Sequence, residues 1–267
     1  MVNINYNPSQ NYFFWDNKIL PYSTYQIELE NNPNSKRIKN RIEISTNINI
    51  YEVPAHKIAK AMTHLDLKML KAIHPIEITD YDGSDEKCPN ILLFANKNTA
   101  LSNYISHEVR KDSKRLRYFF RVAKHLQKLE NYNSLHSVID GIRRHQLTDK
   151  QLDVIMALIN NTKEYFEMRN LLEIRIKKKE FFIPPLEIIL KDVKDSNKNP
   201  ESEIASLRFC ELIEFFVFIQ GKEFSGPLNK KYEHFLLSQF YLHLHSNHPS
   251  VSIKKKSCDI FGLFLFL

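Results

Sequence analysis

The chain has 267 residues, of which 43% are hydrophobic and 26% charged, a balance typical of a globular protein rather than a disordered one. Its 5 glycines are too few for a sheet with many hairpins, a phosphate-binding loop or a dinucleotide fingerprint, so the composition favours an all-α fold. A formal net charge of +7 suits an acidic partner, and charge alone does not choose between a protein surface, anionic lipid and nucleic acid.

Two features bear on the compartment in which the protein works. Cys88, Cys210 and Cys258 are widely spaced and include no CxxC pair, a pattern typical of a reducing compartment. The N-terminus has no charged region followed by an apolar run, so no secretory signal peptide is predicted. We therefore expect a cytoplasmic protein.

The first 49 residues lack a sustained helical period and are rich in Asn, Pro and Tyr. We predict that 1–49 form an irregular extension that packs a few aromatic side chains onto the main domain. Within it, Ile42, Ile44 and Ile48 alternate with polar residues, which is compatible with one short strand.

Helical periodicity begins near Val53 and continues to about Leu244, and we place the main domain at 50–245. The first strong helix stops at Pro75, and a second begins near Pro89. Within the first helix lies Asp66, which we expect to be a buried acid that ties two helices together.

The stretch from Leu116 to Ile142 is the most informative part of the sequence. Apolar residues recur at three- and four-residue spacing in an amphipathic helix, which meets a polar corner at 131–134 and then a second apolar helix. In that corner, Asn131 and Asn133 are expected to cap a helix or to bond nearby backbone. Such a unit is typical of a scaffold that binds another protein.

Further helices are predicted after this unit. Thr148 and Gln151 have the spacing of a capping box. The segment 204–219 is apolar at almost every position, so we expect it at the centre of the core, with Cys210 as a small buried side chain. The last predicted helix, 228–244, is amphipathic.

Four blocks of the sequence follow one another at characteristic separations: AKAMTHLDLKMLKAIHPIEI (59–78), CPNILLFANKNTALSNYI (88–105), RVAKHLQKLENYNSLHSVIDGI (121–142) and IPPLEIILKDV (183–193). In this order they resemble the catalytic domain of Ras-family guanine nucleotide exchange factors, the RasGEF family. The third block is the most similar, because family members characteristically have an IA-x-x-L-x-x-L-N-N-F-N-S-type run there.

The resemblance implies an all-α domain whose bowl-like centre holds the switch II segment of a small GTPase. It also implies a projecting helical hairpin that pries switch I away from the nucleotide. The implied partner is a Ras-family small GTPase, and the implied activity, guanine nucleotide exchange, is not an enzymatic reaction with covalent chemistry. No cofactor, metal ion or nucleic acid is expected.

Carried over by position, the resemblance assigns the hairpin wedge to Val193, Lys194, Asp195 and Asn199. It assigns GTPase binding to seven positions: Asn96, Thr99, Ser102, Arg143, Arg144, Ile204 and Arg208. Basic side chains near the rim of the bowl, among them Lys97, would complement an acidic GTPase surface.

The sequence departs from the family pattern at the hairpin. Where the family usually has Glu-Glu-Gly before an Asn-Pro pair, this chain has Asp-Ser-Asn-Lys at 195–198. The connection from Asn199 to Ile204 is shorter than usual, and Ile-Arg-Arg-His at 142–145 replaces a Leu-Asn-Ser segment. We therefore predict a shortened hairpin, and these changes bear on both exchange activity and the choice of GTPase.

Three functions are compatible with the sequence. The first is nucleotide exchange on a Ras-family GTPase, and the second is a RasGEF-like module that binds a GTPase without exchange. The third is a basic helical protein that binds membrane or nucleic acid. The Asn- and Lys-rich composition is typical of a low-GC genome, and a compact RasGEF domain would suit a bacterial effector that works in the host cytosol or at a membrane facing it.

Residues 246–267 form a separate tail in which Lys254, Lys255 and Lys256 precede an apolar end. That end is shorter than the roughly 20 residues that span a bilayer. Three interpretations stay open: 253–267 make peripheral membrane contact, the tail packs on the core, or the chain is one piece of a longer protein. The histidines around its start, at 243, 245 and 248, lack a fourth ligand, so no zinc site is expected.

Overall fold

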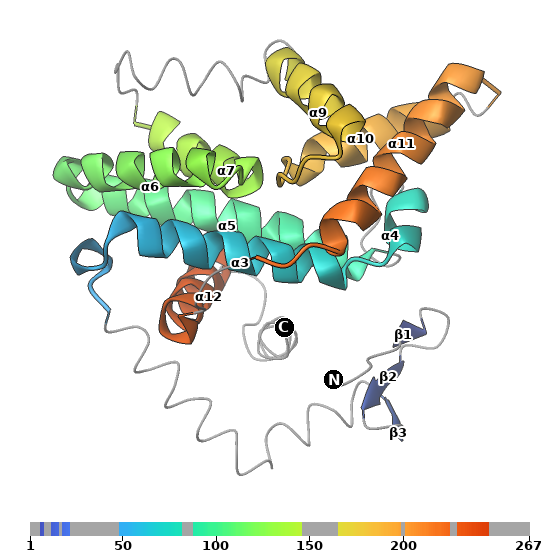
Figure 1. Cartoon of the computed structure of the whole chain (residues 1–267). Helices are drawn as coiled ribbons and strands as arrows, with labels where there is room; N and C mark the ends of the chain where they lie inside the picture. Colours follow the sequence, from blue (N-terminus) through green and yellow to red (C-terminus); the bar gives the residue numbers. More distant parts are fainter. Residues whose placement is uncertain are drawn as a thin grey trace.

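In the computed structural model the described residues are 6–7, 12–15, 18–21, 48–81, 88–145, 165–198, 201–224 and 229–245. Every element of regular structure described from residue 48 onward is a helix, which confirms the predicted all-α domain (Figure 1). In chain order these helices are η1 (Ile50–Glu52), α3 (Ala55–Ala72), α4 (Pro75–Thr79), α5 (Pro89–Lys111), η2 (Ser113–Arg115), α6 (Leu116–Lys128), α7 (Tyr132–Arg143), α9 (Phe166–Lys178), α10 (Leu186–Asn197), α11 (Glu203–Gln220) and α12 (Lys230–His245).

The N-terminal segment contains a small antiparallel sheet in the strand order β1 (Tyr6–Asn7), β2 (Tyr12–Trp15) and β3 (Lys18–Pro21). We expected irregular backbone here. The aromatic run in β2 has high β-propensity, but a strand of four residues is too short to give a clear alternating pattern.

One carboxylate sets the start of two helices. Glu77 accepts the backbone N–H of His74 at 3.1 Å, which completes a capping box at the start of α4. The same side chain accepts the backbone N–H of Asn90 at 2.9 Å, in the first turn of α5. Glu77 therefore fixes how the chain passes from α4 to α5.

The polar corner at 131–134 forms as predicted, between α6 and α7. The N–H of Glu130 bonds the carbonyl of Gln127 and the N–H of Asn131 bonds the carbonyl of Leu126, each at 3.0 Å, which is a Schellman motif. Glu130 occupies the left-handed region, with φ of 55°. Asn131 then caps α7 by accepting the N–H of Ser134 at 3.0 Å.

The central helix is α5, which packs against α7 and α12, while α3 packs against α6 (Figure 1). The contact between α5 and α7 is very close at Gly141. A Cβ atom at this position would lie 2.7 Å from the backbone oxygen of Ser102 and 2.9 Å from Cβ of Ile105. Only glycine therefore allows α7 to approach α5 so closely.

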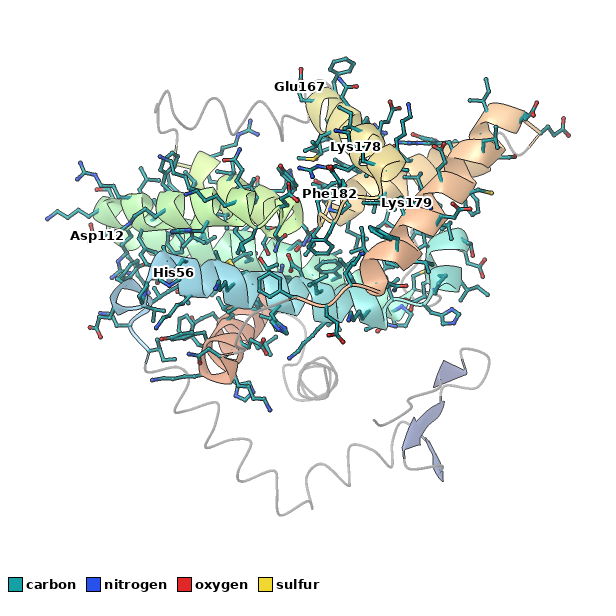
Figure 2. The ribbon with its side chains drawn as sticks, viewed as in Figure 1. His56, Asp112, Glu167, Lys178, Lys179 and Phe182 are labelled. Atoms are coloured by element: carbon teal, nitrogen blue, oxygen red, sulfur yellow. The ribbon has the colours of Figure 1, made fainter. Side chains whose placement is uncertain are left out.

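The pair α10 and α11 forms the predicted helical hairpin, and its tip points away from the other helices (Figure 1). At its base, Phe182 lies between α7 and α11 (Figure 2), with its ring centroid 6.0 Å from Tyr132 and 5.2 Å from Phe215. Gln220, the last residue of α11, donates to the backbone oxygens of Leu70 and Ile73, each at 2.6 Å. The hairpin is thus attached to the body of the domain at its base.

Two expectations for α11 were wrong. The helix does not lie at the centre of the core, because its first half is solvated: Ile204 is 82% exposed and Leu207 is 60% exposed. Cys210 is exposed as well. Burial is limited to residues of the second half, Leu212, Phe215, Phe216 and Ile219. A helix that projects from the domain can be apolar without being buried, and its sequence pattern alone does not reveal this.

Several predictions concern residues outside the described ranges. These are the capping box at Thr148, most of 1–49 and the tail at 246–267, and the predictions made for them stay predictions. Within the described part of the chain, no helix combines the length and the apolar character that crossing a bilayer requires.

Candidate functional site

A groove of about 470 Å³ lies between α5, α7 and α10, and we call it the central groove. Apolar and polar side chains both line it, so it can receive a segment of mixed character. The lining residues are Tyr81, Ala95, Asn98, Thr99, Ser102, Asn133, His136, Ser137, Asp140, Arg144, Pro185, Leu186, Glu187, Leu190, Lys191 and Lys194.

A buried polar network supports this groove. Asn98 and Asn133 exchange two amide hydrogen bonds, of 2.9 and 3.0 Å. Asn133 also donates to Asp66 at 3.2 Å and accepts the backbone N–H of Leu186 at 3.3 Å. Asn133 therefore joins α3, α5, α7 and α10. This confirms Asp66 as a buried acid that ties helices together. The cap role predicted for the corner belongs to Asn131, whereas the side chain of Asn133 bonds residues distant in the sequence.

Beneath the groove, Lys97 and Asp66 form an ion pair in which both side chains are fully buried. Lys97 also donates to the hydroxyl of Ser134 at 3.0 Å, and that hydroxyl donates to Asp66 at 2.7 Å. Burial lowers the pKa of Lys97, and the charge of Asp66 opposes this shift. The expectation that Lys97 lies near the rim was wrong, because its side chain is buried and paired with Asp66. The sequence alone does not show that these two residues meet.

One wall of the groove carries an ionised carboxylate. Asp140 accepts hydrogen bonds from the Ser102 hydroxyl and, at 2.8 Å, from Arg144. Burial would raise the pKa of Asp140, but the bonds from Ser102 and Arg144 outweigh burial and lower it below its ordinary value. Arg144 also donates to Asn103 at 2.7 Å, so its guanidinium is held between α5 and α7.

The sequence of residues 57–216, more than half of the chain, matches the family model described as the RasGEF domain. The chain belongs to the RasGEF family. Two relatives from Dictyostelium discoideum are Ras guanine nucleotide exchange factor Q, 24% identical over 210 residues, and Ras guanine nucleotide exchange factor O, 24% identical over 204 residues. These matches cover 71% and 70% of this chain, but only 16% and 21% of the relatives' own length.

Four of the predicted GTPase-binding and wedge residues of this RasGEF domain meet at the central groove: Thr99, Ser102, Arg144 and Lys194. Lys194 is exposed on α10, and no carboxylate in the described ranges forms an ion pair with it. The structure does not place Asn96 or Arg143 among the lining residues.

A second, open cleft of about 1030 Å³ lies between α9, α10 and α11, and we call it the hairpin cleft. Three other predicted residues line it: Asp195, Ile204 and Arg208. At its base Asp192, which is 7% exposed, pairs with Arg169 of α9 and lies 3.7 Å from Arg208 of α11. Arg208 is therefore engaged in holding the hairpin of the RasGEF domain together.

The two remaining wedge residues have different outcomes. Val193 has no exposed surface and belongs to the core, so its assignment as a contact residue was wrong. It lies on the inner face of α10, where it anchors the helix by apolar burial. Asn199 lies outside the described residues.

His136, Asp140 and Glu187 are among the groove residues that the sequence did not predict. The Nδ1 atom of His136 lies 3.2 Å from a Glu187 oxygen, and Glu187 accepts a hydrogen bond from the Tyr165 hydroxyl at 2.8 Å. The spacing of Asp140 and Arg144, four residues apart on one helix, was a visible signal. The contact from His136 to Glu187 depends on the fold and had no local signal.

Among the residues that the structure describes, no three His, Cys, Asp or Glu side chains gather as a metal site would require. The ring of His243, from the histidine cluster, lies instead 5.1 Å from that of His107 and 5.4 Å from that of Tyr104.

Proposed function

We propose that this RasGEF domain promotes guanine nucleotide exchange on a Ras-family small GTPase. The observation that supports the proposal is that α10 lines both the central groove and the hairpin cleft. Lys194 lines the central groove, and the next residue, Asp195, lines the hairpin cleft. A GTPase seated in the groove would therefore meet the hairpin at the same time.

In this proposal the central groove receives the switch II segment. Thr99 offers an exposed hydroxyl to it, Lys194 offers a cation, and Leu190 contributes apolar surface. The hairpin then competes with switch I for its position over the nucleotide. Release is accelerated because the complex has a higher affinity for the nucleotide-free GTPase than for the loaded form, and no covalent step is needed.

The charges of the groove indicate what the GTPase would present. Lys194 favours an acidic side chain on the partner, which would raise the encounter rate, whereas the charge of Arg144 is already compensated by Asp140. The proposed place of action is the cytoplasm, and it is the host cytosol if the chain is a delivered bacterial effector.

One observation favours the second candidate, a module that binds a GTPase without exchange. Asp195, which was assigned as the acidic wedge, pairs within its own helix with Lys198 at 2.8 Å. An acid engaged in this way is less able to disturb the magnesium and phosphate site of a GTPase. The two candidates therefore share the groove and differ in the action of the hairpin.

Release of fluorescent GDP from Ras-, Rap-, Ral- and Rho-type GTPases, with and without the full chain, tests both candidates. Acceleration of at least tenfold for one member supports exchange. Binding to a nucleotide-free GTPase without acceleration supports the second candidate, and the absence of both contradicts each of them.

A matched pair of variants ties either result to the groove. Thr99→Arg places a large cation in the central groove, whereas Asn170→Arg places the same side chain on the exposed surface of α9, outside both clefts. We expect the first to abolish the interaction and the second to leave it unchanged.

A further inference from the structure

The strongest concentration of positive charge in the described chain lies outside the residues that line the two clefts. Residues 110–128, from the end of α5 through α6, contain eight lysines and arginines and a single acid, Asp112. Asp112 caps η2 by accepting the N–H of Lys114 at 2.9 Å. Figure 2 shows Asp112 at the end of the helical layers opposite the hairpin.

Four of these cations form a single row on α6. Arg117, Arg121, Lys124 and Lys128 follow the spacing that puts side chains on one face of a helix, and all four are exposed. The row is about 16 Å long at 1.5 Å per residue. In the described part of the chain no carboxylate forms an ion pair with Arg117, Arg121 or Lys128. We call these four residues the α6 stripe.

The opposite face of α6 is fixed to the protein. Phe119, Val122, Ala123 and Leu126 have no exposed surface, and the helix packs against both α3 and α7. Because α3 and α7 cover its other sides, α6 exposes to solvent only the face that carries the α6 stripe. No residue of α6 lines either cleft.

We propose that the α6 stripe docks the domain on an anionic membrane surface. A straight row of long cationic side chains on a fixed helix matches a plane of lipid headgroups, which can move laterally to meet each charge. A single-stranded nucleic acid is a poorer match because the stripe offers no free aromatic face for stacking. Tyr118 and Phe119 are buried, and the Lys124 ammonium lies 4.7 Å from the Phe120 ring centroid.

This docking is independent of the proposed exchange activity. It places α6 against the bilayer and leaves the central groove, on α5, α7 and α10, to a protein partner. It is also distinct from any contact made by the tail, because the stripe belongs to the folded domain.

Sedimentation with vesicles tests the proposal on the full chain. Vesicles of phosphatidylserine and phosphatidylcholine are compared with vesicles of phosphatidylcholine alone, at two salt concentrations. A variant in which all four stripe residues become Gln is compared with a control that loses the same charge at Lys177, Lys178, Lys230 and Lys231, which are exposed on α9 and α12.

Each basic side chain near an anionic leaflet raises the partition coefficient by about fivefold, so we expect the stripe variant to bind phosphatidylserine vesicles at least tenfold more weakly. The control should change by less than about threefold, and wild-type binding should weaken as salt screens the charges. Equal loss in both variants, or no loss in the stripe variant, would assign binding to net charge or to the tail and overturn the proposal. Binding to duplex DNA without binding to vesicles would overturn it too.

Two controls keep these outcomes separate from folding and from exchange. The stripe variant should keep the urea midpoint of the wild type, because the substituted side chains are exposed. If it does not, the double variant Arg121→Gln/Lys128→Gln replaces it and should still bind at least threefold more weakly. GDP release in solution should be unchanged, so a failure of membrane docking is distinguishable from a failure of the proposed function.

Discussion

The side-chain oxygen of Asn133 accepts the backbone N–H of Leu186 at 3.3 Å and so joins the start of α7 to the first residue of α10. The segment around Asn133 is the part of the sequence most similar to the family pattern, whereas α10 leads into the part that departs from it. This bond therefore connects the scaffold with the helix that both candidate surfaces share.

Loss of the hydrogen bonds of Asn133 should lower the stability of the domain. Asn133→Ala removes the bonds to Leu186, Asp66 and Asn98 and leaves the buried N–H of Leu186 without its acceptor, so we expect about 2–4 kcal/mol of destabilisation. Urea unfolding measures it. Asn96→Ala, at a half-exposed position on the same groove-forming α5, should change the stability by no more than about 0.5 kcal/mol. Equal effects would mean that the network does not support the fold.

The ion pair between Asp66 and Lys97 should show strong coupling. Lys97→Met leaves the Asp66 carboxylate buried without its cation, and we expect a loss of about 3–5 kcal/mol. The double variant Asp66→Leu/Lys97→Met should lose at least about 1 kcal/mol less than the sum of the single losses, because the buried charge is gone as well. Additive losses in a double-mutant cycle would contradict this.

Substitution by alanine should affect the stability of the domain differently at two glycines. At Gly141 the new Cβ would meet the backbone of α5, so Gly141→Ala should destabilise the domain by about 1–3 kcal/mol despite its better helix propensity. At Gly221 the nearest atom would be the Phe218 oxygen at 3.5 Å, an ordinary contact, so Gly221→Ala should be neutral or slightly stabilising. Thermal unfolding of the two variants compares them directly.

Lys194 should matter for the partner and not for the fold. Lys194→Glu reverses an exposed charge at the central groove, so we expect GDP release, or affinity for the nucleotide-free GTPase, to fall by about tenfold. The urea midpoint should stay at the wild-type value. Lys177→Glu, the same reversal on the outer surface of α9, is the control. An equal fall in both would show that only net charge is involved.

His243 should make stability depend on pH. Burial, with a smaller effect from His107, lowers the pKa of His243 to about 4, against about 6.5 in the unfolded chain. Between these two pH values His243 is protonated in the unfolded state and neutral in the folded state. Its contribution to the free energy of unfolding is therefore complete above about pH 6.5 and declines as the pH falls toward 4. His243→Leu should make the stability in urea decline less steeply over this range, and an unchanged slope would contradict the prediction.

Periodicity predicted most of the helices correctly, because a helix that packs on one side repeats its apolar residues with the helical period. It could not identify Lys97 as buried, because its partner Asp66 lies 31 residues away and nothing local links the two. Nor could it place α11, whose apolar first half is exposed.

The sequence predicted which segments form the candidate site, but not which way each side chain of those segments points. Val193, Lys194 and Asp195 are consecutive, yet the first is buried, the second lines the central groove and the third lines the hairpin cleft. Successive residues point about 100° apart on a helix, so a family resemblance that locates the right turn still leaves the direction of each side chain open. Only the packing of α10 against its neighbours decides it.

The hydrogen bonds from Gln220 give α11 one fixed end and one free end. One face of its last two turns is buried and tied to α3, while most side chains of its first two turns are exposed. Force applied near Ile204 would therefore rotate α11 about its C-terminal end before it disturbed the core. Local opening of the first turns costs few buried contacts, and the hairpin can yield to a partner without unfolding the domain that carries it.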